Sequence, residues 1–133
     1  MKILTGIYFL LGKPNCLRWS IWNSELDVKS ISMLDVGFNE MPFIFLYLGL
    51  KKDNKIQIGK RRKALYQCQI DFIFDSENLY FDTDDWGGGR ILPASSDDDV
   101  KGLINVLRND KRFVFLGEAN ESEVKLMIEK DSV

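Results

Sequence analysis

Runs of apolar residues separated by short polar segments dominate the first half of the chain. Residues 3–11 and 16–22 are apolar, β-branched or aromatic, and the Gly-Lys-Pro-Asn sequence at 12–15 is typical of a turn. Residues 43–50 are continuously apolar, as expected for a strand that is buried on both faces. The pattern therefore predicts a β-hairpin over residues 3–22 and a central strand at 43–50.

The longest predicted strand, at 64–74, alternates between apolar and polar positions. Its apolar side chains share one face, which carries Ile70, Phe72 and Phe74. Turn-forming residues follow at 75–78. Shorter apolar runs predict further strands at 56–58, 79–81, 112–116 and 124–128.

Apolar residues recur clearly at helical spacing in one segment, 97–109, where they are Val100, Leu103, Ile104 and Leu107. Ser96 or Asp97 is the predicted N-cap of this helix, and carboxylates in the first turn favour the positive end of its macrodipole. Residues 24–36 fit helical spacing only loosely, with Ser24 as a candidate cap. We expect a second helix near 24–36, and a strand with one solvated face is the alternative.

These elements predict one domain of the α+β class that covers residues 1–133. Six to eight strands form a largely antiparallel sheet built from hairpins, because hairpin connections are too short for parallel crossovers. The helix at about 97–109 packs on one face of this sheet. The apolar segment at 3–11 is too short to span a bilayer and no signal-peptide cleavage site follows it, so we expect a cytoplasmic protein.

The chain contains no histidine, which excludes a Ser-His-Asp triad, a Cys-His pair or a histidine-ligated metal within it. Its two cysteines, Cys16 and Cys68, are too few for a disulfide framework or a four-ligand zinc site. We interpret both as half-buried thiols in a reducing compartment, with a single disulfide between them as the alternative. Because no catalytic, cofactor or metal motif is recognised, we expect a protein that is not an enzyme.

Charge is segregated along the chain, although the formal net charge is only −2. Residues 51–63 carry seven cations and one acid, whereas residues 71–99 carry nine carboxylates and a single cation, Arg90. The pI of about 5.2 argues against general affinity for nucleic acids. An acidic chain of this size without a catalytic motif is typical of a protein that binds another protein.

The segment Asp82-Thr-Asp-Asp-Trp-Gly-Gly-Gly-Arg is the main candidate for partner contact. We predict that it opens a long loop at 82–99, in which Arg90 folds back onto neighbouring aspartates. Trp86 is a candidate binding anchor, and packing against its own loop is the alternative. The aspartates at 97–99 are explained by helix capping and form a second rim of the surface. The predicted partner-binding residues are Asp82, Asp84, Asp85, Trp86, Arg90, Asp97, Asp98 and Asp99.

We therefore expect an acidic inhibitor or immunity-type protein, of bacterial or phage origin by analogy with that protein type. It would neutralise a toxin, or another basic target that handles nucleic acids, by protein–protein contact. Complementary charge would speed the encounter of the two proteins and set their register.

Two other functions are alternatives. A divalent-metal-dependent hydrolase would take ligands from Asp71, Asp75, Asp82 and Asp84, although solvated turn residues also explain these aspartates. A nucleic-acid-binding or phage anti-defence accessory protein would use the basic run at 60–63, with stacking surfaces from Tyr47, Tyr66 and Tyr80. A protected strand edge also explains the basic run, as does pairing with the acidic stretch of a second copy in a homodimer.

Overall fold

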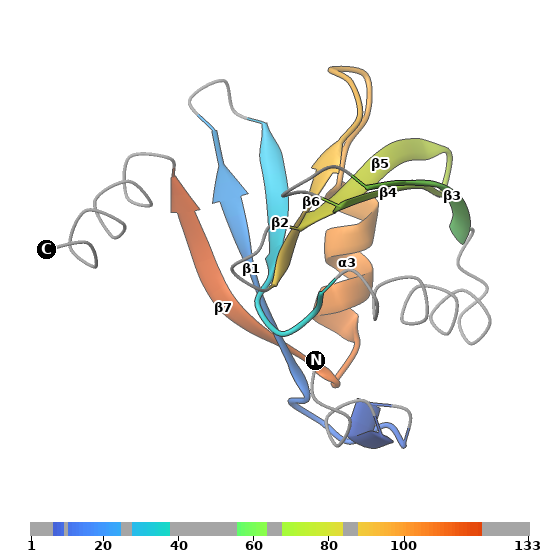
Figure 1. Cartoon of the computed structure of the whole chain (residues 1–133). Coiled ribbons are helices and arrows are strands. Elements are labelled where there is room, and N and C mark those ends of the chain that lie inside the picture. Colours follow the sequence, from blue (N-terminus) through green and yellow to red (C-terminus); the bar gives the residue numbers. More distant parts are fainter. Residues whose placement is uncertain are drawn as a thin grey trace, which may run out of the picture.

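The computed structural model describes residues 7–9, 11–24, 28–37, 56–63, 68–83 and 88–120. Its strands are β1 (Leu17–Asn23), β2 (Lys29–Met33), β3 (Ile56–Lys63), β4 (Cys68–Phe74), β5 (Glu77–Thr83), β6 (Gly89–Pro93) and β7 (Phe113–Asn120). They form one sheet in the order β3-β4-β5-β6-β2-β1-β7 (Figure 1). The helix α3 (Lys101–Asn109) lies against one face of this sheet. The predicted α+β class with a large sheet is thereby confirmed.

Neighbouring strands of the sheet are antiparallel with one exception, because β7 runs parallel to β1. Most of the domain lies between β1 and β7 in the sequence, so the connection is long enough for a parallel crossing. A prediction built from hairpins does not find this pair.

The core lies between α3 and one face of the sheet. Apolar residues at every second position of a strand point toward this face. In β4 these positions are Ile70, Phe72 and Phe74, as predicted, and in α3 they are Leu103, Ile104 and Leu107. A glycine on the helix allows close packing, since a Cβ atom at Gly102 would lie 3.1 Å from Cε1 of Phe74. The alternation of β4 therefore leaves Gln69, Asp71 and Ile73 on the face that α3 does not cover.

Two predictions for the N-terminal part are wrong. Residues 7–9 are helical, with the Leu11 amide donating to the Ile7 carbonyl at 3.0 Å, so the strand predicted at 3–11 is absent at these residues. The segment expected as a second helix contains β2, whose residues 30–33 are buried. A short apolar run does not by itself distinguish a strand from a helix. For β2, pairing with β1 and β6 decided the outcome.

Some predicted elements cannot be compared with the fold. The central strand at 43–50, the last strand at 124–128 and residues 64–67 of the predicted long strand lie outside the described residues. Within the described ranges, no helix is long and apolar enough to cross a membrane.

The start of α3 also differs from the prediction. The helix begins at Lys101 rather than about 97, and Val100 occupies the N-cap position without a side-chain cap. Neither Ser96 nor Asp97 is the cap. Instead the Asp99 carboxylate accepts the Lys101 amide at 2.8 Å. The Asp98 carboxylate accepts the amide of Asn78 in β5. The acidic residues therefore hold the loop that precedes the helix.

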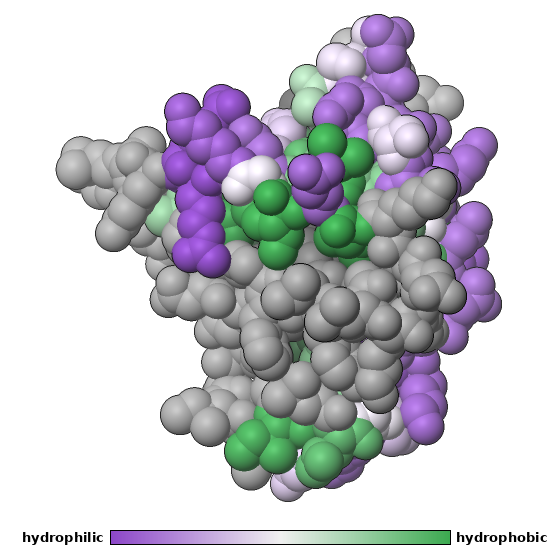
Figure 2. Space-filling view, turned by 90° about the vertical axis from the view of Figure 1, so that its right-hand side faces the viewer, coloured by the Kyte–Doolittle hydropathy of each residue, from purple (hydrophilic) through white to green (hydrophobic). Residues whose placement is uncertain are grey.

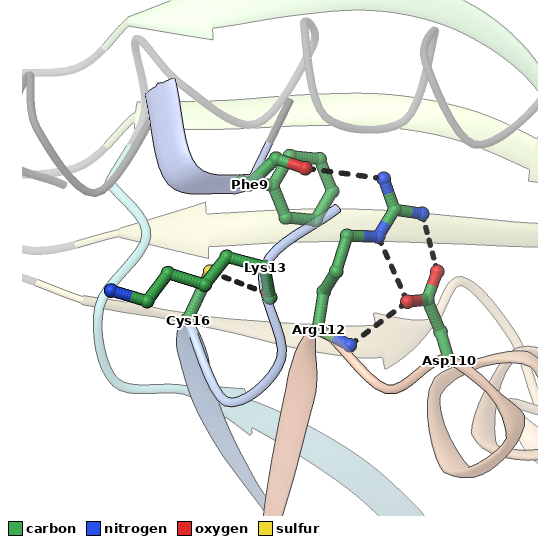
Figure 3. Close-up of polar contacts among 5 residues, drawn as sticks. All are labelled: Phe9, Lys13, Cys16, Asp110 and Arg112. Carbon is green, nitrogen blue, oxygen red and sulfur yellow. Dashed lines mark hydrogen bonds and ion pairs between the residues drawn. The ribbon is translucent and has the colours of Figure 1, made fainter. Parts of the chain in front are cut away.

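A buried ion pair joins the N-terminal helical segment to the connection between α3 and β7 (Figure 3). Arg112 and Asp110 are 5 % and 4 % exposed, and both amino groups and the Nε atom of the guanidinium face buried acceptors. Arg112 Nε donates to Asp110 Oδ1 at 2.8 Å, Nη2 donates to Oδ2, and Nη1 donates to the Phe9 carbonyl at 3.5 Å. The guanidinium also lies 4.2 Å from the centroid of the Phe9 ring. This cluster fixes two segments that are far apart in sequence.

Candidate functional site

The predicted long loop at 82–99 is in large part a β-hairpin. Asp82 lies in β5 and is the register partner of Arg90 in β6, so only a short connection separates the two strands. Arg90 is turned toward the sheet: its Nη2 donates to Ser30 Oγ at 3.1 Å, and its guanidinium lies 5.2 Å from the Trp22 ring centroid. The remaining predicted contact residues of this segment, Asp84, Asp85 and Trp86, lie outside the described residues.

Two of the three consecutive glycines are explained by packing rather than by loop flexibility. Gly88 has a φ of 71°, and a Cβ there would lie 3.0 Å from the carbonyl oxygens of Met33 and Leu34. At Gly89 a Cβ would lie 2.2 Å from Cζ of Phe81, which is fully buried. The sheet therefore requires glycine at both positions.

A second group of acidic residues gathers where β4, β5 and α3 meet the loop after β6. We name this surface the acidic corner; it consists of Asp75, Glu77, Asp97, Asp98 and Asp99. The β4–β5 turn holds Asp75 and Ser76 at φ values of 47° and 70°, which is typical of a tight two-residue hairpin turn. The loop after β6 projects from the molecule in Figure 1, and the same end is hydrophilic in Figure 2.

Hydrogen bonds to backbone amides hold the acidic corner in place. The Asn78 amide donates to Asp98 Oδ1, and the Asp99 amide donates to Glu77 Oε2, both at 2.8 Å. Ser95 Oγ donates to Asp98 Oδ2 at 2.8 Å. The Asn78 amide and then the Ser95 hydroxyl hold the pKa of Asp98 below its ordinary value, so this carboxylate is charged at neutral pH.

The negative charge of the acidic corner is not neutralised by ion pairs. Among the described residues, no ion pair includes any of its five carboxylates. Two lysines, Lys29 and Lys101, line a hollow of about 500 Å³ beside Asp98 and Asp99. The corner is thus a fixed acidic surface with a cationic margin.

The structure separates the two groups of predicted contact residues. Asp82 lies five positions along β5 from Glu77, which corresponds to roughly 17 Å in an extended strand. The aspartates at 97–99 therefore join Glu77 rather than Asp82. Sequence reasoning did not include Glu77, although its place directly after a tight turn could have put it at this end of the hairpin.

The other candidate residues have structural partners. Asp71 accepts from Arg62 Nη2 at 2.8 Å. The basic run lies on β3, at one end of the sheet formed by the described strands. Cys16 and Cys68 are not joined in a disulfide. Burial raises the pKa of Cys16, with smaller opposing effects from Lys13 and Arg112. In the part of the chain that the structure describes, no three His, Cys, Asp or Glu side chains are arranged to hold a metal ion.

Comparison with known proteins adds no relative, because no family model, curated sequence or solved structure matches the chain significantly.

Proposed function

We propose that this chain is a non-enzymatic binding protein of the inhibitor or immunity type, which acts in the cytoplasm by docking its acidic corner on a basic protein. The observation that carries the proposal is the set of five carboxylates that no cation of the described chain pairs with. Uncompensated charge of one sign on a small surface attracts a partner of the opposite sign and speeds encounter.

The rigidity of the corner supports the same function. Its loop is held by the hydrogen bonds that join Asp98 to Asn78 and Asp99 to Glu77. A surface that is ordered before binding loses less conformational entropy when the complex forms. The charges of the acidic corner are therefore already in a fixed arrangement before a partner binds.

The partner class follows from charge. A toxin nuclease binds phosphates through a basic cleft, and an acidic surface of fixed shape is complementary to such a cleft. A second contact region remains a prediction. It consists of Asp82, near the opposite end of β5, Arg90 in β6, and Asp84, Asp85 and Trp86, which lie outside the described residues. A bacterial or phage origin would be consistent with this class of partner.

The test is binding to a panel of immobilised basic nuclease toxin domains. The proposal predicts association with at least one of them, with an on-rate that falls as salt is added. In water, two unit charges about 10 Å apart interact by about 0.4 kcal/mol, so each lost charge slows association roughly twofold at low salt. Asp97→Asn combined with Asp99→Asn should slow it about fourfold.

Asn at position 99 keeps an acceptor for the Lys101 amide, so this double variant tests charge rather than folding. Asp35→Asn is the matched control, because Asp35 follows the opposite end of β2 and pairs with Arg18. Equal on-rates for wild type and the Asp97/Asp99 variant, or binding to no member of the panel, would count against the proposal.

A further inference from the structure

A hollow of about 530 Å³ opens over β3, β4 and β5 on the face of the sheet that α3 does not cover. Beside it, β3 carries a bulge between Ile58 and Arg61. Gly59 lies in this bulge directly against Asp71: a Cβ at Gly59 would lie 3.0 Å from the Asp71 carbonyl oxygen. Gly59 therefore adds no side chain beside Asp71, and the hollow reaches β3, at one end of the sheet formed by the described strands.

Polar side chains, including that of Tyr80, make up about half of the residues that line this hollow. Its polar lining consists of Gln57, Arg62, Gln69, Asp71, Asn78 and Tyr80. The ion pair between Arg62 and Asp71, at 2.8 Å, cancels two charges and fixes the guanidinium over the floor. Tyr80 is the register partner of Asp71, and both residues line the hollow.

The two glutamines are available to a ligand. The side chains of Gln57 and Gln69 make no hydrogen bond with another described residue. Each amide offers both donors and an acceptor, which suits the edge of a nucleobase. The half-buried Tyr80 ring offers a flat surface on which a base stacks.

One exposed cation lies next to the hollow. Lys60 directly follows Gly59 in the β3 bulge and is exposed. A cation at this position suits a phosphate that is attached to a base inside the hollow. The acidic pI does not oppose this arrangement, because Asp71 is paired with Arg62 inside the hollow and the exposed Lys60 adds a positive charge beside it.

We propose that this hollow binds a nucleotide unit, with the base against Tyr80 and between Gln57 and Gln69, and the phosphate at Lys60. The volume is in the range of small-ligand pockets, about 300–1,000 Å³. A free nucleotide and one unit of a single-stranded nucleic acid share this chemistry. A duplex does not, because its bases are stacked inside the helix. The inference is independent of the proposed docking of the acidic corner.

The experiment titrates the chain with two kinds of probe at low salt. Nucleoside monophosphates are followed by changes in amide resonances, and short labelled oligouridylate and oligoadenylate by fluorescence anisotropy, with a duplex as competitor. Saturable binding of the monophosphates with no gain for the oligomers identifies a free nucleotide as the ligand. Tighter binding of the oligomers, not competed by duplex, identifies a single strand.

Variants assign the binding to the hollow. Tyr80→Leu should weaken binding roughly fivefold or more, whereas Tyr80→Phe keeps the ring and should bind like wild type. Lys60→Ala should weaken oligomer binding and lower its salt dependence by about one counterion, with Lys111→Ala, an exposed lysine away from the hollow, as the control. Lys60 is exposed, so this variant decides the matter even if Tyr80→Leu does not fold. No saturable binding of either probe, or binding that Tyr80→Leu and Lys60→Ala leave unchanged, overturns the inference.

Discussion

Replacing Arg112 with Met should destabilise the fold more than any exposed charge change in the described chain. Arg112 and Asp110 are both about 95 % buried, and three guanidinium nitrogens donate to Asp110 or to the Phe9 carbonyl. Arg112→Met removes these donors but keeps the Arg112 backbone amide on Asp110 Oδ1. The buried carboxylate then loses its ion-pair partner, the Arg112 guanidinium.

Breaking one partner of a buried ion pair costs about 3–5 kcal/mol. A domain of this size has a free energy of unfolding of about 5–15 kcal/mol, so the variant should lose a large fraction of it. With a urea m-value of about 2 kcal/mol/M, the unfolding midpoint should fall by about 2 M. Tryptophan fluorescence follows the transition, because Trp19 is fully buried in the core.

Two further variants separate the ion pair from general damage. Arg18→Met breaks a comparable ion pair to Asp35 whose arginine side chain is 56 % exposed, so it should shift the midpoint far less. Asp110→Asn added to Arg112→Met removes the buried charge and should restore part of the lost stability. A midpoint for Arg112→Met within the error of wild type, or a double variant less stable than Arg112→Met, would refute the reasoning.

Three other changes have defined outcomes. Gly89→Ala would place a Cβ 2.2 Å from Cζ of the buried Phe81 and should lower the free energy of unfolding in urea by about 1–3 kcal/mol. Adding Phe81→Leu should lessen this loss, and strictly additive losses would contradict the steric explanation. The Arg18 guanidinium holds the pKa of Asp35 below its ordinary value. The Asp35 carboxylate therefore adds stability above pH about 4, and this stability is lost as the pH falls through the lowered pKa. Acid unfolding of Asp35→Asn should be less steep in that range, and an unchanged profile would argue against a contribution of Asp35 to stability. Burial raises the pKa of Cys16, so its thiol should react slowly with iodoacetamide at neutral pH and faster as the pH rises, as measured by mass spectrometry; rapid, pH-independent alkylation of Cys16 would contradict this.

The sequence was sufficient to predict the elements whose pattern repeats over several residues. Alternation in β4 and helical spacing in α3 identified their buried faces correctly, because one side of each element packs on the core. The β5–β6 hairpin was missed because acids and glycines surround its short strands. Position 89 of β6 needs glycine because the Phe81 ring fills the space that a side chain would occupy.

The acidic residues show where local reasoning fails. Asp98 lies in the first turn of the predicted helix, three residues before the observed start of α3. Its carboxylate accepts the amide of Asn78, which is 20 positions away. A carboxylate near a helix start satisfies whichever free amide tertiary structure brings to it. Likewise, Arg112 lies in a charged segment of the sequence, and only the fold reveals that it is buried against Phe9.

Hydrogen exchange of the chain in complex with a basic nuclease domain tests the account most directly. If the acidic corner is the docking surface, complex formation should protect the amides at 75–78 and 95–101, while those at 7–9 and 111–112 exchange as in the free chain. Protection confined to β3, β7 or another region outside the acidic corner, with 75–78 and 95–101 unchanged, would contradict the proposed docking surface.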